Sequence, residues 1–337
     1  MPEPQHNPGI CLYGAEALRE LLGALTAEIE GVRAAVDIEY IHRMRVASRR
    51  LRAALAIFAP CLPKKRATGW TREIRRITRA LGAARDTDVQ LDFLVDFLSN
   101  EAASREKAGL RRILLRLQQQ RTRLQRDVLK ALEELERGKA IPEMQAELQR
   151  IITLGQQHAV DAAAPAVQHW AAIAVAARLD EFLAYESAVT HPERLEELHA
   201  MRIAAKRLRY TMQLFSPLFP EVVKSALSAA RKIQDTLGDF HDCDVWVTFI
   251  TAFQQEERTR TIKYYGHTRT FYLLQPGFST LRDNRLAMRD QRYREFADYW
   301  RRITEKELWT TLRAELAGFL IAEVVAPTED QAEGLTE

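Results

Sequence analysis

A histidine followed by a run of basic residues occurs twice in this sequence of 337 residues. The two copies consist of His42, Arg45, Arg49, Arg50 and Arg52, and of His199, Arg202, Lys206, Arg207 and Arg209. Arginine presents a planar fork of N–H donors that matches phosphate and carboxylate oxygens, and histidine donates to the same groups, more strongly when protonated. These residue types therefore indicate anion binding.

The spacing predicts that the basic residues form a stripe along a helix. At about 100° per residue, and with His42 at zero, Arg49 falls near 340°, Arg45 near 300° and Arg52 near 280°. Met44, Leu51 and Leu55 fall between about 180° and 240°, on the opposite side. We therefore expect an apolar seam packed into a bundle and a basic stripe facing away from it. Arg50 and its equivalent in the second copy lie on the other flank of the helix.

A second basic segment follows each stripe. The first contains Arg72, Arg75, Arg76 and Arg79, and its weaker counterpart contains Lys224, Arg231 and Lys232. Like charges at three- and four-residue steps on a helix destabilise it by a few tenths of a kcal/mol per pair. The stripes are therefore expected either to bind a ligand or to be neutralised within the fold. The carboxylates that could neutralise them are Asp86, Asp88, Asp242 and Asp244.

These paired segments predict a tandem duplication. The His/Arg segments recur 157 residues apart, and the segments running from Arg75 to Val89 and from Arg231 to Val245 recur 156 apart. Two ordered blocks at nearly one spacing indicate a repeated unit of about 150 residues, an ordinary domain size. We place the first half at residues 10–150, the second at 157–322, and an acidic tail at 326–337, all within a single domain.

The elements that must position these residues are predicted to be helices. Only 14 Gly and 12 Pro occur in the chain, and Ala, Leu, Glu, Arg and Gln, which favour helix, are abundant. We expect helices at about 13–34, 38–59, 67–81, 88–102 and 105–137, then 157–186, 194–215, 221–237, 243–258 and 285–322. In this scheme Gly82 ends one helix and Asp86 or Asp88 caps the next. The fold class is therefore all-α, with two pseudo-symmetric helical-bundle halves.

The net charge of +3 conceals an uneven distribution of charge. The basic residues are concentrated in two blocks, 33–126 and 199–302, which alternate with acidic segments. No apolar stretch is long enough to span a membrane, and Met1–Cys11 does not have the pattern of a secretory signal. Three cysteines without metal-type spacing favour reduced thiols in a cytoplasmic protein.

The doubled motif H-x-x-R-[VI]-x-x-[RK]-R-L-R, followed by R-[RK]-I-x-x-x-L-G-x-x-[RH]-D-x-D-V, resembles the CHAD family, the conserved histidine α-helical domain. The resemblance covers residues 10 to 320 and implies an all-helical fold that binds inorganic polyphosphate through a basic surface or central cavity, without catalysis. It assigns polyphosphate contacts to all the stripe and second-segment residues named above. It also implies a stand-alone member that associates with polyphosphate granules. Asp235, opposite Arg79, makes the second half a weaker match.

Two other functions remain open on sequence grounds. Arginine stripes also suit nucleic acid, although no aromatic residue lies within either stripe to stack on bases, so only non-specific binding is expected. A metal-dependent phosphohydrolase would use His42, His199, His241, Asp242 and Asp244, but the recurring neighbours of these histidines are Arg and Lys, which repel a cation. We therefore expect no catalytic residue, no metal and no cofactor.

Overall fold

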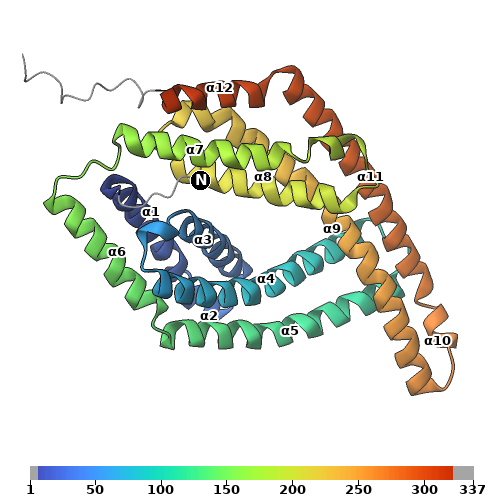
Figure 1. Cartoon of the computed structure of the whole chain (residues 1–337). Coiled ribbons are helices and arrows are strands. Elements are labelled where there is room, and N and C mark those ends of the chain that lie inside the picture. The colour runs from blue at the N-terminus through green and yellow to red at the C-terminus, as the bar shows by residue number, and fades with distance from the viewer. Residues whose placement is uncertain (1–6, 322–337) are drawn as a thin grey trace, which may run out of the picture.

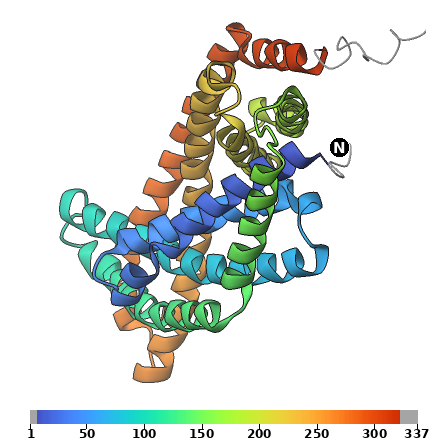
Figure 2. The same cartoon turned by 90° about the vertical axis from the view of Figure 1, so that its left-hand side faces the viewer.

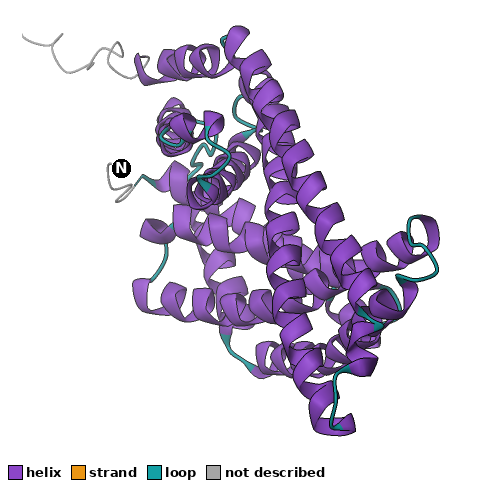
Figure 3. Cartoon of the chain, turned by 90° about the vertical axis from the view of Figure 1, so that its right-hand side faces the viewer, coloured by secondary structure: helices purple, strands orange, loops and turns teal. Residues whose placement is uncertain are grey.

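The computed structural model describes residues 7–321, and within that range every regular element is a helix (Figure 3). The prediction of an all-α fold is confirmed for this part of the chain. The predicted acidic tail, 326–337, lies outside the described residues. No helix within residues 7–321 combines the length and hydropathy needed to cross a membrane.

The first half of the chain forms six α-helices and one short 3-10 helix. They are α1 (Pro8–Thr26), α2 (Ile29–Ala34), α3 (Ile38–Ile57), η1 (Ala59–Cys61), α4 (Lys64–Asn100), α5 (Lys107–Arg137) and α6 (Ala140–Gln157). The second half follows with α7 (Pro165–Leu183), η2 (Glu186–Thr190), α8 (Leu195–Phe215), α9 (Pro220–Tyr265), α10 (Arg269–Tyr272), α11 (Gln275–Glu305) and α12 (Leu308–Ile321). The helices that carry the two stripes are α3 and α8.

The helices of the two halves pack in the same order. In the first half α3 lies between α1 and α4, α4 packs on α5, and α6 packs on α1. In the second half α8 lies between α7 and α9, α9 packs on α11, and α12 packs on α7 (Figure 1). α3 also contacts α8, so the two stripe helices meet at the centre of the molecule. The evolutionary duplication itself stays a prediction.

Aromatic rings join the two halves beside these stripe helices. Phe58, directly after α3, and Phe215, at the end of α8, are both fully buried, and their ring centroids lie 6.0 Å apart. Trp170 of α7 contacts both rings, at 5.5 Å and 5.6 Å. Buried edge-to-face contacts of this kind add to the area that is removed from water. The α3–α8 junction therefore belongs to the main core.

Several predicted helix boundaries are wrong. The helix predicted at 13–34 is two helices, α1 and α2, and the one predicted at 157–186 begins only at Pro165. α4 runs from Lys64 to Asn100 and α9 from Pro220 to Tyr265 without a break, so Gly82 ends no helix, and Asp86 and Asp88 cap none. Apolar residues on both sides of Gly82 are buried, and this burial offsets the roughly 1 kcal/mol that an internal glycine costs a helix. The predicted helix at 285–322 is two helices, α11 and α12, which are separated at Glu307, where φ is 52°.

No helix was predicted where the structure has α6. Pro142 occupies the first turn of this helix, where its missing N–H costs nothing. Helix α6 packs against α1 and buries Met144, Leu148 and Ile152. It therefore covers α1 in the way that α12 covers α7.

The expectation of three reduced cysteines is also wrong. Cys11 of α1 and Cys61 of η1 form a disulfide, with their Cα atoms 5.2 Å apart, and Cys243 is free and buried. The fold brings the start of α1 against the turn that follows α3, which places the two Cα atoms within disulfide range. The inference from reduced thiols to a reducing compartment therefore fails for this pair.

Candidate polyanion-binding site

The two predicted stripes form a single group of cations at the contact between α3 and α8. The charges of Arg49 and Arg202 both act on Arg45, and Arg45, Arg49 and Arg202 all act on Lys206. On the α4 side, Arg52 lies within the field of Arg49 and of Arg75 and Arg79. We call the resulting set the basic cluster. Its members are Arg45, Arg49, Arg52, Arg75, Arg79, Arg202 and Lys206.

Partial burial raises the electrostatic cost of this cluster. Burial, and then the neighbouring Arg49 and Arg202, lower the pKa of Lys206 to about 8. Burial is also the largest cause of the lowered pKa values of Arg45 and Arg52, and like-charge neighbours add to it. When cations lower one another's pKa values, binding of an anion stabilises their charged forms.

Glycines in α4 and α9 provide space for two of these arginines. A Cβ atom placed on Gly82 would lie 3.6 Å from Nε of Arg45, and one placed on Gly238 would lie 3.4 Å from Nε of Arg202. The guanidinium of Arg45 therefore crosses α4 at Gly82, and that of Arg202 crosses α9 at Gly238. The Leu-Gly pair therefore lies directly beside an arginine of the stripe in both halves, where a side chain longer than that of alanine would meet the guanidinium.

The four aspartates of the motif form an ion pair with only one member of the cluster. Asp86 pairs with Arg45 at 3.0 Å. Asp88 pairs instead with Arg121 at 2.5 Å, and Asp244 with Arg289 at 3.1 Å. Asp242 forms no ion pair within residues 7–321, but its carboxylate lies in the field of Arg202 and Arg45. Neutralisation within the fold therefore reaches Arg45 and Arg202 and does not account for the rest of the stripes.

Among the other predicted cations, Arg76 pairs with Glu134, Arg207 with Glu181, and Lys224 with Glu221. The remaining predicted Arg and Lys residues form no ion pair with any carboxylate in the described part of the chain. Among the predicted contacts, three half-buried arginines have a buried Nε atom without a hydrogen-bond partner there: Arg50, Arg52 and Arg202. The cluster therefore keeps most of its positive charge and several unused donors.

Not every predicted residue joins the cluster. Arg50, Arg209 and Arg231 form a second group, in which the guanidinium of Arg209 lies over the ring of Tyr210, 4.7 Å from its centroid. Lys232 faces the carboxylates Asp239 and Glu295. Arg72 is exposed on α4, and Arg76, Arg207 and Lys224 are held by the acids named above.

Both histidines of the motif lie next to other cationic groups. Burial, followed by the charge of Arg85, lowers the pKa of His42. Burial also lowers the pKa of His199, whose ring centroid is 4.2 Å from that of His241 and whose Nδ1 has no hydrogen-bond partner in the described residues. Neither histidine is hydrogen-bonded to an aspartate there. Both imidazoles are therefore expected to be neutral at pH 7 and able to accept a proton near an anion.

Arg85 and His241 were not among the predicted polyphosphate contacts, although they occupy the [RH] position of the second motif block and lie beside His42 and His199. Their adjacency to His42 and His199 explains why that position follows the His helix at a fixed spacing. No group of three or more His, Cys, Asp or Glu side chains within residues 7–321 has a geometry that would hold a metal ion.

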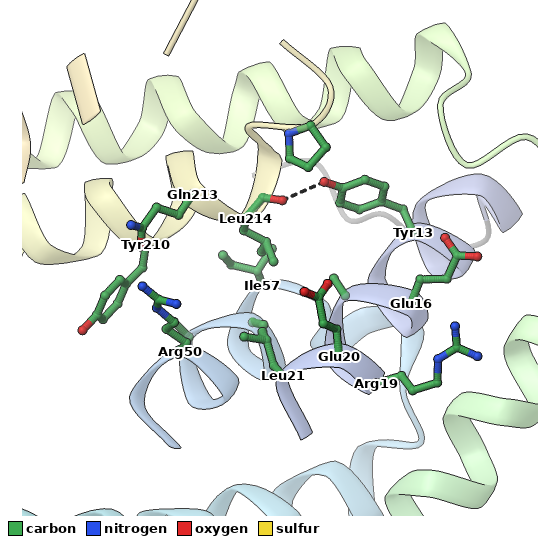
Figure 4. A pocket seen from close by; sticks show the side chains of 14 residues that line it. Tyr13, Glu16, Arg19, Glu20, Leu21, Arg50, Ile57, Tyr210, Gln213 and Leu214 are labelled. Atoms are coloured by element: carbon green, nitrogen blue, oxygen red, sulfur yellow. Dashed lines mark hydrogen bonds between the residues drawn. The ribbon is translucent and has the colours of Figure 1, made fainter. Parts of the chain in front are cut away.

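A separate groove of about 920 Å³ runs between α1, α3 and α8 (Figure 4). Glu16 and Arg19 lie at one end and Arg50 and Tyr210 at the other, with Glu20 between them. The hydroxyl of Tyr13 donates to the carbonyl of Leu214 at 2.7 Å. Of the predicted contacts only Arg50 lines it. Its carboxylates make this groove less suited to a polyanion than the basic cluster.

Comparison with known proteins places these features in a family. Residues 16–251 match the family model described as "CHAD domain". Two uncharacterised proteins of Mycobacterium tuberculosis, from strains CDC 1551 and H37Rv, are each 31% identical over 221 residues, which is 60% of this chain. That region spans only 38% of the length of either relative.

Two solved structures share the fold. The crystal structure of the CHAD domain from the plant Ricinus communis is 23% identical, with a TM-score of 0.59, and the match covers 89% of this chain and 91% of that one. PptA from Streptomyces chartreusis is 16% identical, with the same TM-score, over 87% of this chain and 99% of its own. At these identities the likeness concerns the fold alone.

Proposed function

Because this chain belongs to the CHAD domain family, a family linked in general to polyphosphate binding, we propose that its basic cluster binds inorganic polyphosphate without catalysing a reaction. One observation carries the proposal: cations from both halves gather at the α3–α8 contact, and most of them have no carboxylate partner. A polymer with one negative charge per phosphate supplies the missing counter-charge along an extended path.

The physical basis is neutralisation together with counterion release. A polyanion holds condensed cations that are released when protein cations replace them, so the affinity falls steeply with salt concentration. The unused Nε donors of Arg52 and Arg202 then gain acceptors, and the lowered pKa of Lys206 returns towards its ordinary value. Binding therefore relieves costs that the free protein bears.

Non-specific binding of nucleic acid is the competing function for this same surface. Tyr210 is the aromatic side chain beside the stripes, and its ring is covered by the guanidinium of Arg209. With one face of this ring occupied, the stripes offer little surface on which a base could stack, which favours a ligand made only of phosphates. Under this proposal long-chain polyphosphate displaces nucleic acid from the cluster at a lower concentration than the reverse exchange requires.

The proposal is tested by removing two cluster charges. Calorimetric titration with polyphosphate should show an affinity at least tenfold lower for Arg49→Ala/Lys206→Ala. Its slope of log affinity against log salt should become shallower by about 1.5 to 2, because two phosphate contacts are lost. The control Arg111→Ala/Arg126→Ala removes two exposed arginines of α5 and should change the affinity little. An equal loss of affinity in the two variants would show that binding depends on total charge and not on the basic cluster.

The two histidines give the proposed site a dependence on pH. Because burial and neighbouring cations lower their pKa values in the free protein, a bound polyanion raises them and protons are taken up. The affinity should therefore increase as the pH falls below 6.5, and His42→Ala/His199→Ala should abolish that increase. If the double variant has the same affinity as the wild type between pH 6 and 8, the histidines do not contact the ligand.

The absence of catalysis is part of the proposal and has its own measurement. Purified protein incubated with polyphosphate and Mg²⁺ or Mn²⁺ should release no phosphate. Steady release that depends on the metal would support the phosphohydrolase instead.

A protein that binds the polymer is expected to gather where it is stored, in cytoplasmic polyphosphate granules, and a fluorescent fusion compared with the cluster variant tests this location.

A further inference from the structure

The second half of the chain carries an extension that the first half does not have. Helix α9 contains 46 residues, whereas its counterpart α4 contains 37. Helices α9 and α11 run side by side to a protruding end that also carries α10 (Figures 1 and 2). This end, residues 258–273, lies beyond the residues that match the family model. We call it the α9–α10 tip.

The tip exposes aromatic rings that contribute to no core. Tyr264 is 81% exposed, Tyr272 62% and Tyr265 55%. The rings of Tyr264 and Tyr265 lie 4.7 Å apart, and the ring of His267 is nearly parallel to that of Tyr265, at 16° and 6.1 Å. Clustered rings that face solvent mark an interaction surface.

The tip is anchored to α11 by a buried aromatic contact. Phe271 is only 3% exposed, and it packs on Phe278 of α11 with centroids 6.2 Å apart. Gly266, with a φ of 73°, ends α9 in the left-handed conformation and lets the chain reverse at once. The exposed rings are therefore presented in a fixed arrangement and do not come from an unstructured loop.

The charge of the tip is entirely positive. From Arg258 to Arg282 the chain contains no Asp or Glu. The exposed residues Arg258, Lys263 and Arg269 pair with no carboxylate in the described structure, whereas Arg260 is held by Glu256 and Glu257. Free cations beside exposed rings suit a ligand with both phosphates and flat, stackable groups.

We propose that the α9–α10 tip binds single-stranded nucleic acid, with Tyr264, Tyr265 and Tyr272 stacking on bases and Lys263 and Arg269 contacting the phosphates. Aromatic side chains in a cationic setting bind single strands with little sequence preference, because every base has a π-face. Only two exposed aliphatic residues accompany the rings, Ile262 and Leu273, which is little apolar surface for insertion into a lipid bilayer.

Fluorescence anisotropy with a labelled single-stranded oligonucleotide of about 12 nucleotides tests this site, a length that spans a typical single-strand footprint. The measurement uses the Arg49→Ala/Lys206→Ala background, so that the basic cluster does not mask the tip. Replacing all three tyrosines by Ala should lower the affinity about fivefold or more for each stack that is lost. Replacing them by Phe should preserve most of the affinity. The matched control changes three exposed aliphatic residues elsewhere to Ala: Val36, Val89 and Val245.

Two results would overturn the proposal. One is an oligonucleotide affinity that is the same in the triple Ala variant and the control. The other is binding to anionic phosphatidylserine vesicles that depends on the tip and survives the triple Tyr→Leu change, which would assign the tip to a membrane. In the wild-type background the triple Ala variant should bind polyphosphate normally. The proposals for the tip and for the basic cluster can therefore be refuted independently.

Discussion

Lys206 should give polyphosphate binding an alkaline limit. Its amine lies between Arg45, Arg49 and Arg202, and partial burial together with these charges lowers its pKa to about 8. In the free protein Lys206 thus loses its proton between pH 7 and pH 9. In the complex the polyanion holds the proton on the amine, so binding at alkaline pH must include proton uptake.

The size of the effect follows from that pKa. With a value of about 8, roughly nine-tenths of the Lys206 amines are charged at pH 7 and about one-tenth at pH 9. If the bound form stays charged, the affinity falls by up to about tenfold across this range, and about half a proton is taken up per complex at pH 8. Below pH 7 the contribution of Lys206 is complete.

Calorimetry in two buffers with different ionisation enthalpies measures both quantities. Lys206→Arg keeps the positive charge at every pH in this range, so it should abolish the alkaline loss and the proton uptake. Lys130→Arg, at an exposed position on α5, is the matched control and should behave like the wild type. If Lys206→Arg and the wild type lose affinity in parallel from pH 7 to 9, Lys206 does not contact the ligand.

Three further perturbations test the framework around the site. Gly82→Leu should displace Arg45 and weaken polyphosphate binding by up to about tenfold, whereas Gly82→Ala, whose Cβ fits at 3.6 Å, should bind normally and gain up to about 1 kcal/mol of stability; equal affinities for the two variants would refute the positioning role. Replacing Cys11 and Cys61 by Ser should cost about 4 kcal/mol, since the disulfide closes a separation of 50 residues, and denaturant unfolding with and without reductant measures this. Glu257 is fully buried and forms ion pairs with three arginines, so Glu257→Gln should lower the free energy of unfolding by about 3 kcal/mol. Burial opposes ionisation of Glu257, but hydrogen bonds from its arginines outweigh it and lower its pKa, so the stabilisation is present above about pH 4.5 and is lost as the pH falls through the folded value; unfolding curves from pH 7 to 3 check this.

The sequence predicted the stripe helices well because their chemistry follows from local periodicity. Residues at three- and four-residue steps share a helix face in any environment, so the grouping of Arg45, Arg49 and Arg52 required only the helical repeat. The predicted helices at 38–59, 105–137 and 194–215 agree closely with α3, α5 and α8. That α3 would meet α8, and so place Lys206 beside Arg49, depends on tertiary packing and went beyond the sequence.

The errors have a common cause, which is that local signals were interpreted without their tertiary neighbours. Gly82 has the sequence features of a helix end, but it lies beneath Arg45 inside α4. Cys11 and Cys61 have no informative spacing, and only the fold brings them together. No helix was predicted between 258 and 285, because the short helix α10 and the exposed tyrosines of this segment follow no core periodicity.

The central claim is that cations of both halves form one binding site for inorganic polyphosphate. Titrating the wild-type protein with long-chain polyphosphate at about 50 and 200 mM salt tests it most directly, because counterion release ties the affinity to the number of phosphate contacts. The account predicts saturable binding at the lower salt and an affinity at least about a hundredfold weaker at the higher, as expected when five or more cations engage the polymer. No binding at the lower salt, or binding that is indifferent to salt, would contradict it.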